Sequence, residues 1–129
     1  MIEPKWLSER LVLYIHQEQL LEHGGLPGLR DKGVFLSALN KAKNLFLYET
    51  PTIPQLAAAY AIGFCKNHPF VDGNKRVALV LCEYFLESNN FYLSASDEDV
   101  YTVFMELASS KISDDVFSAW IIQNTQEIN

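Results

Sequence analysis

Residues 66–76 hold the densest group of side chains in this sequence that could do chemistry on an anion: Lys66-Asn67-His68-Pro69-Phe70-Val71-Asp72-Gly73-Asn74-Lys75-Arg76. The last three residues bring hydrogen-bond donors and two positive charges together, and Gly73 lets the backbone approach a ligand closely. Asp72 has the carboxylate needed to hold a divalent cation that bridges phosphate oxygens. His68 is the imidazole within reach of these groups and can act as a general base near neutral pH. The segment therefore predicts a phosphate-binding site with a base beside it.

Each of these residues also has an ordinary structural explanation. Asp72 taken alone is more often a helix cap, and His68 taken alone is more often a hydrogen-bonded residue at a helix end. Lys75 and Arg76 could be solvated charges, although positive charges in the first turn of a helix oppose the helix dipole unless an anion is bound. Because all these residue types occur within nine positions, we interpret the segment as a functional site.

Two apolar segments flank this loop and must position it. Leu56–Cys65 and Val77–Leu86 are apolar around the whole helix, which is typical of buried helices. Pro69 disfavours helical geometry at the residue before it, so the first helix should end just before His68. The second should begin near Asp72-Gly73 and end at Asn89-Asn90. We expect two central, buried helices joined by the active-site loop.

Helical patterns and helix-end signals cover the rest of the chain. Gly24-Gly25 should end a first helix, and further helices should start at Asp31, at Thr52, where Gln55 completes a capping box, at Ser96 and at Ser113. The stripes expected to face the core are Leu7, Leu11, Tyr14 and Ile15; Phe35, Ala38, Leu39, Ala42 and Phe46; Val100, Val103, Phe104 and Leu107; and Val116, Phe117, Trp120 and Ile121. No convincing strand is present, the nearest candidate being the short run Phe91–Leu93. The pattern predicts a compact all-α bundle of about six helices in one domain, residues 1–129.

Composition excludes several classes of function. The formal net charge of −6 and a sequence pI near 4.9 argue against binding nucleic acid directly through a broad cationic surface. The longest uncharged apolar stretch has ten residues, whereas a membrane span needs roughly 20. The first residues lack the pattern of a secretory signal. We therefore expect a cytoplasmic protein with no membrane contact, in which Cys65 and Cys82 are buried, unpaired thiols.

The segment His68–Arg76 resembles the signature of the Fic/Doc family, HxFx(D/E)(G/A)N(G/K)R. Lys75 stands where typical Fic enzymes have glycine, which resembles the Doc ("death on curing") toxin branch. Residues 28–33 and 37–39 are also similar to a Doc-branch segment. The resemblance implies a compact six-helix fold with the loop between two central helices.

The same resemblance implies a role for each motif residue. His68 would deprotonate a target hydroxyl, and Phe70 would be buried and anchor the loop. Asp72 would bind Mg²⁺. The remaining roles concern ATP: its phosphates would be held by the anion cradle Gly73, Asn74 and Lys75 and by Arg76.

Two enzymatic activities follow from this family. Doc-type toxins are kinases that move the γ-phosphate of ATP onto elongation factor Tu and block translation, and a separate antitoxin protein covers their site. Fic enzymes of the glycine type instead transfer AMP to a protein hydroxyl (AMPylation). Lys75 favours the kinase, whereas Pro69 and Gly73 are the forms found in many Fic enzymes, so nucleotidyl transfer stays the alternative. A catalytically inactive binding module is disfavoured because every chemical residue of the motif is present.

Other motif fragments carry no function. His16-Gln17-Glu18 matches the start of a deaminase motif, but no PCxxC follows, so zinc is not expected. His16 and His23 are interpreted as a helix-face residue and a helix-end residue. Ser94 and Glu98 only loosely match the self-inhibitory helix of some Fic proteins, so inhibition would come from another chain.

Overall fold

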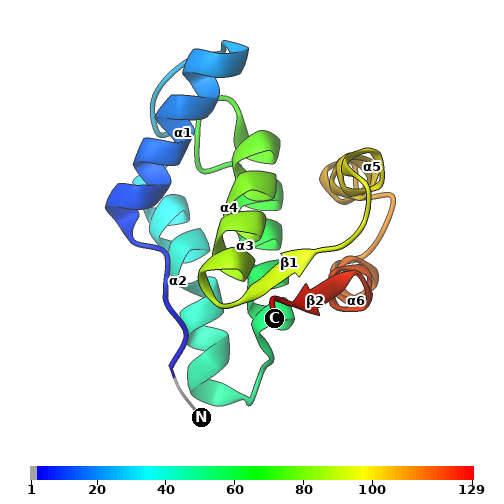
Figure 1. Ribbon diagram of the computed structural model, residues 1–129. Helices are drawn as coiled ribbons and strands as arrows, with labels where there is room; N and C mark the ends of the chain where they lie inside the picture. The colour runs from blue at the N-terminus through cyan, green and yellow to red at the C-terminus, as the bar shows by residue number, and fades with distance from the viewer. Residues whose placement is uncertain (1–2) are drawn as a thin grey trace.

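The computed structural model describes residues 3–129, and within them it confirms an all-α bundle of six helices with one small two-stranded sheet (Figure 1). The elements are α1 (Glu9–His23), α2 (Lys32–Tyr48), α3 (Ile53–Asn67), α4 (Asn74–Ser88), β1 (Phe91–Leu93), α5 (Asp97–Ala108), α6 (Asp114–Gln123) and β2 (Thr125–Glu127). The two central helices α3 and α4 are joined by residues 68–73 alone, so the loop that carries the motif lies at one end of this pair, as predicted.

Helix α3 is the centre of the molecule. It packs against α2 on one side and α4 on another, and α5 and α6 cover the rest of it (Figure 1). Every residue from Leu56 to Cys65 is buried, as the uninterrupted apolar pattern predicts. Gly63 allows α2 to approach closely, because a Cβ at this position would lie 3.3 Å from the backbone of Ala38 in α2.

Helix α4 is less enclosed than its apolar pattern predicts. Its buried residues form one face: Asn74, Val77, Ala78, Leu81, Cys82, Phe85 and Leu86. Tyr84 points outward and is 44% exposed, and Leu79 and Val80 are only partly buried. The expectation that Val77–Leu86 is buried on all sides was therefore wrong. An apolar side chain does not need a buried position, because much of any protein surface is apolar.

The predicted helix starts agree with the capping seen in the structure. Asp31, Thr52, Ser96 and Ser113 each accept a hydrogen bond from a backbone N–H in the first turn of α2, α3, α5 and α6. Thr52 and Gln55 also form the reciprocal capping box. Ser8 caps α1 in the same way. These bonds satisfy donors that every helix leaves free at its start.

The face of α1 that enters the core differs from the predicted stripe. Val12, Ile15 and His16 are its buried residues, whereas Tyr14 is 58% exposed. The buried positions follow the spacing i, i+3, i+4, one position away from the stripe that included Tyr14. The histidine interpreted as a helix-face residue thus lies against the core, toward the loop between α3 and α4.

A short sheet closes the C-terminal part of the chain. Phe91–Leu93 is a strand, and it pairs antiparallel with Thr125–Glu127 in the register Phe91 with Glu127. Sequence patterns suggested the first strand only weakly and did not identify the second, because Thr125, Gln126 and Glu127 have no apolar alternation. The pairing joins the end of α6 to the end of α4.

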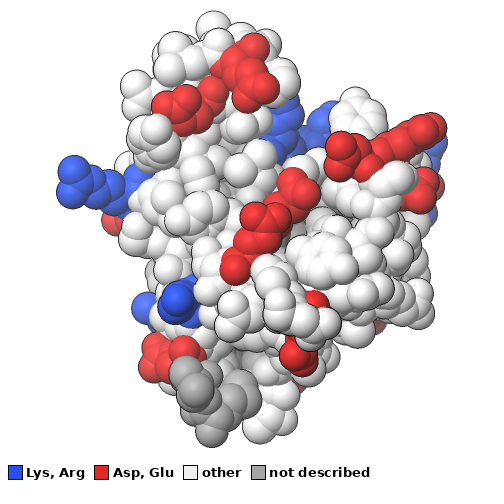
Figure 2. All heavy atoms as spheres, viewed as in Figure 1, with Lys and Arg blue, Asp and Glu red and all other residues white. Residues whose placement is uncertain are grey.

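Surface charge follows the acidic composition. Figure 2 shows acidic atoms over the upper end of α1, along α4 and on α5, with basic atoms in the recess between the upper end of α4 and α5. Among the residues described, no helix is both long enough and apolar enough to cross a membrane.

Candidate active site

The loop 68–73 leaves α3 through an uncommon backbone conformation. His68, the C-cap of α3, has φ 50° and ψ 58° in the left-handed region. A side chain other than glycine pays about 1–3 kcal/mol there, so its surroundings must hold it. Arg30 does so, because its Nε donates to the His68 carbonyl at 2.6 Å and its Nη2 donates to the Asn67 carbonyl at 2.9 Å. The guanidinium thus caps α3 and sets the direction in which the His68 side chain leaves the backbone.

Backbone pairing adds a second restraint on the loop. The segment before α2 runs antiparallel to the loop, with a bridge between Leu29 and Phe70. The Arg30 N–H donates to the Pro69 carbonyl at 2.8 Å, and the Val71 N–H donates to the Gly28 carbonyl at 3.0 Å. Residues 28–30, which resemble a family segment in sequence, are therefore structural partners of the motif.

The Asn74 side chain holds the loop closed by bonding to the backbone of Phe70. Its Oδ1 accepts from the Phe70 N–H and its Nδ2 donates to the Phe70 carbonyl, both at 2.9 Å. The side chain is 9% exposed. Since the amide is used within the loop, what Asn74 can offer to an anion is its backbone N–H at the start of α4.

Phe70 anchors the loop in the core. It is 1% exposed and lies among aromatic rings: Phe35 at 5.7 Å between ring centroids, Phe64 at 6.3 Å and His16 at 3.7 Å. The His16 ring is nearly parallel to that of Phe70, with 7° between the planes. Residues from α1, α2 and α3 therefore meet at this one side chain of the motif.

The Asp72 carboxylate lies at the surface and is held by backbone N–H groups. Its Oδ2 accepts from the Leu26 N–H at 3.1 Å and its Oδ1 accepts from the Gly73 N–H at 2.8 Å. These bonds, that from Leu26 most of all, together with the nearby Arg76 and His16, lower the pKa of Asp72 below its ordinary value, so the group is anionic at neutral pH. Gly25 makes this approach possible, because a Cβ there would lie 2.9 Å from the carboxylate.

Helix α4 begins without a side-chain cap, unlike the five other helices of residues 3–129. Its N-cap is Gly73, at φ 81° and ψ 10°, a conformation that suits glycine. The first-turn N–H groups, those of Asn74, Lys75 and Arg76, consequently remain available to a ligand. A helix start of this kind presents donors and partial positive charge to an anion.

The Arg76 side chain adds an unsatisfied donor to the three free N–H groups at this end of α4. One of its guanidinium nitrogens, Nη2, donates to the Gly24 carbonyl at 3.0 Å. Its Nε is buried and has no hydrogen-bond partner among residues 3–129. A buried donor without a partner costs stability. Arg76 lines the same hollow as the open helix start, so its positive charge and its unused donor capacity fit a phosphate group bound there.

These groups line one hollow of about 390 Å³: Cys65, His68, Val71, Asp72, Gly73, Asn74, Lys75, Arg76 and Ala108. The structure thus brings together six of the seven motif residues singled out in the sequence, while Phe70 lies beneath them in the core. His68 is exposed and Lys75 is half-buried. Cys65 is buried, and burial raises the pKa of its thiol to about 11, so it is protonated and not a nucleophile at neutral pH.

The single carboxylate in this hollow fits a magnesium ion of the kind that binds together with a nucleotide. No group of three or more His, Cys, Asp or Glu side chains is arranged as a metal site in the described chain. Mg²⁺ usually takes only one or two carboxylates and completes its shell with phosphate oxygens and water. Asp72 supplies one such carboxylate, whose oxygens can each accept further bonds beyond those from Leu26 and Gly73.

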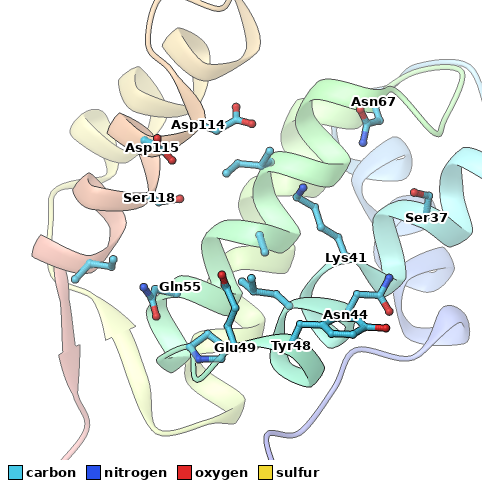
Figure 3. A pocket seen from close by; sticks show the side chains of 15 residues that line it. Ser37, Lys41, Asn44, Tyr48, Glu49, Gln55, Asn67, Asp114, Asp115 and Ser118 are labelled. Atoms are coloured by element: carbon cyan, nitrogen blue, oxygen red, sulfur yellow. The ribbon is translucent and has the colours of Figure 1, made fainter.

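A larger hollow of about 860 Å³ lies between α2, α3 and α6 (Figure 3). Lys41 reaches into it from α2, and Asp114 and Ser118 face it from α6 (Figure 3). Lys66 already pairs with Asp114 at 3.3 Å. The charges are mixed and exposed, and the hollow has neither a buried donor without a partner nor an open helix start, so the smaller hollow is the candidate site.

The supporting roles of two residues were missed by sequence analysis. Arg30 lies in the segment 28–33 that resembles the family, but an exposed arginine in a loop has no periodicity that could indicate its contacts with the motif. His16 did carry a periodic signal, since it follows Val12 by four positions on the same helical face. The aromatic and hydrogen-bonding surroundings that explain its burial come from a segment more than 50 residues away and are invisible in a local pattern.

Comparison with known proteins agrees with this geometry. Residues 6–86 match the sequence profile of a family described as the Fic/DOC family. The match covers 81 of the 129 residues, from the segment before α1 into α4, and includes the whole loop. A protein of Escherichia phage P1 named protein kinase doc is 29% identical over 93 residues, which span 71% of this chain and 74% of that protein.

Proposed function

Since the chain belongs to the Fic/DOC family, we propose that it is a Doc-like protein kinase, which transfers the γ-phosphate of ATP to a hydroxyl group of a target protein. The observation that carries the proposal is the uncapped start of α4, where free N–H groups line one hollow together with Lys75 and Arg76, whose Nε has no hydrogen-bond partner within residues 3–129. The relative named protein kinase doc supports phosphoryl transfer as the reaction.

The roles of the residues follow from their positions. The first-turn N–H groups of α4 and the Arg76 guanidinium bind phosphate oxygens, which spreads negative charge over fixed donors. Asp72 is anionic and held in place, so it would hold Mg²⁺ together with those oxygens. The metal ion, when bound, supplies charge neutralisation that lowers the barrier to transfer.

His68 is the base in this proposal. It is exposed at the rim of the hollow, and its backbone is fixed by Arg30. The imidazole accepts the proton of the target hydroxyl as the oxygen forms a bond to the γ-phosphorus. The bond from that phosphorus to the β–γ bridging oxygen breaks, and ADP leaves with the electron pair.

Lys75 favours the kinase over AMP transfer. In this proposal its ammonium takes up room in the hollow that a glycine at the same position would leave free for the outer phosphates of ATP; we call this room the second anion subsite. With the β- and γ-phosphates excluded from that subsite, the γ-phosphorus is the one that faces the base. AMP transfer stays the second candidate because Pro69 and Gly73 have the form common in Fic enzymes.

The target and the regulator follow from the family resemblance. We propose that the target is elongation factor Tu, that its phosphorylation blocks translation, and that the protein is the toxin of a toxin–antitoxin pair. The antitoxin would be a separate protein that covers the hollow. ATP and a translation factor meet in the cytoplasm, where this activity would take place.

The decisive experiment compares two labels. The protein is incubated with elongation factor Tu and Mg²⁺, and in parallel with a bacterial lysate, using ATP labelled at either the α or the γ phosphorus. Label from the γ position alone supports the kinase, and intact-mass analysis should then show a gain of one phosphate per modified protein. Label from the α position with a gain of AMP identifies a nucleotidyl transferase, and no label from either position in both reactions contradicts both activities.

A further inference from the structure

His16 is a buried imidazole that the proposed reaction does not use. It lies in the second turn of α1 and is only 5% exposed. An ionisable side chain is seldom buried without a hydrogen bond that compensates for the lost water. The contacts of His16 therefore indicate why it occupies this position.

His16 makes two contacts with the loop between α3 and α4, one through its ring and one through a ring nitrogen. The ring stacks on Phe70 with 3.7 Å between centroids, and Nε2 lies 2.9 Å from the carbonyl oxygen of Asp72. A carbonyl oxygen can only accept, so the hydrogen must be on Nε2. This bond crosses 56 positions of sequence and joins α1 to the loop between α3 and α4.

The peptide between Asp72 and Gly73 is consequently held at both ends. Its carbonyl accepts from His16, and its N–H donates to the Asp72 carboxylate at 2.8 Å. The orientation of this peptide sets both the direction of the Asp72 carboxylate and the direction in which α4 leaves the loop. Gly73 has the freedom of a left-handed residue, so a side chain from outside the loop is needed to select one orientation.

We propose that His16 is a positioning residue, which orients the Asp72–Gly73 peptide so that the Asp72 carboxylate and the first-turn N–H groups of α4 face the same phosphate. The proposal deepens the phosphoryl-transfer function and rests on it. His16 is not among the residues that line the hollow, so it does not touch the reacting atoms and acts through the Asp72–Gly73 peptide.

Two substitutions separate the hydrogen bond from the packing. His16→Phe keeps a ring on Phe70 and removes the donor, whereas His16→Gln removes the ring and keeps an N–H that can reach the Asp72 carbonyl. His23→Phe is the matched control, because His23 is an exposed histidine on the same helix. The stability of each variant is measured first, by thermal unfolding.

The first measurement is independent of activity. In wild type, nitrogen-15 spectra should show a hydrogen on His16 Nε2, and the Gly73 amide should exchange slowly with solvent. In His16→Phe that amide should exchange about tenfold faster, whereas His16→Gln and His23→Phe should remain near wild type. A histidine with its hydrogen on Nδ1 alone, or equal Gly73 exchange in wild type and a folded His16→Phe, overturns the proposal.

The second measurement concerns the ligand. Titration calorimetry with Mg²⁺ and a non-hydrolysable ATP analogue should give an affinity about tenfold weaker for His16→Phe, and His16→Gln should recover most of it. Kinase assays should show the same split, with a raised requirement for Mg²⁺ and ATP. If His16→Phe is folded and binds like wild type, or if both variants weaken only in proportion to lost stability, His16 is a packing residue. If wild type transfers no phosphate, the kinase proposal fails, and the Gly73 measurement still decides the role of His16.

Discussion

Asn74 gives the sharpest test of how the loop is built. Within residues 3–129, the N–H and the carbonyl of Phe70 each bond to the Asn74 side chain and to no other group. Asn74→Ala would leave both buried groups without partners. Each such group costs about 1–3 kcal/mol, and the loop is near enough to the surface for water to relieve part of this. We therefore expect a loss of about 3 kcal/mol in the free energy of unfolding, or roughly 10 °C in Tm for a chain of this length.

Urea unfolding followed by circular dichroism would measure this loss. Asn40→Ala is the matched control, because Asn40 is an exposed asparagine whose Nδ2 donates to the Leu36 carbonyl of its own helix at 2.9 Å. That change should cost no more than about 0.5 kcal/mol. Equal losses for the two variants would refute the claim that Asn74 holds the loop closed.

Asn74→Asp refines the same test through pH. A carboxylate can accept from the Phe70 N–H but cannot donate to the Phe70 carbonyl, whereas a protonated carboxyl can do both. Folding should therefore raise the pKa of the new carboxyl above its unfolded value. A group of this kind binds more protons in the native state, so the stability of the variant relative to wild type should be best at low pH and decline as pH rises through that pKa. A pH-independent difference between the two proteins would contradict the assigned geometry.

His68→Ala should reduce phosphoryl transfer by a factor of roughly 10²–10⁴, as expected for a lost general base, with little change in urea unfolding because His68 is exposed; an unfolded variant or one with full activity would exclude that role. Lys75→Gly should reduce γ-phosphate transfer and reopen the second anion subsite, which labelled ATP and intact mass can follow; an unchanged product formed at an unchanged rate would mean that the lysine is incidental. The Cys65 and Cys82 thiols should resist a thiol reagent at pH 8 and react after unfolding in urea, because burial raises the pKa of both, to about 11 for Cys65. Rapid labelling of the folded protein at pH 8 would show that the thiols are accessible and ionised.

Helix ends were predictable because the signals are local. Thr52 and Gln55 lie within one turn of each other, and their capping box needs no other part of the chain. The burial of Leu56–Cys65 was equally predictable, since a helix without a polar face has no side to present to water. Pro69, which disfavours helical geometry at the residue before it, then places the motif at the end of α3.

Other features depend on contacts between distant segments. Tyr14 and His16 both fit a helix, and only the position of the loop 68–73 decides that the histidine is the buried one of the two. Tyr84 lies outside because nothing in residues 3–129 covers that face of α4. The strand Thr125–Glu127 exists because Phe91–Leu93 offers it an edge. Propensity could not reveal any of these contacts.

The incomplete start of α4 has a consequence for how long the protein survives in a cell. A ligand that binds only the native state raises the free energy of unfolding, by about 2.7 kcal/mol when its concentration is 100 times its Kd. The population of unfolded molecules falls accordingly. An anion bound to the open N–H groups of α4 is such a ligand, and it accepts the hydrogen bonds that no side-chain cap accepts there. Proteases that degrade opened molecules act on that population. If the anion is the nucleotide of the proposed kinase, turnover of this protein should slow when nucleotide is abundant and quicken when nucleotide is scarce.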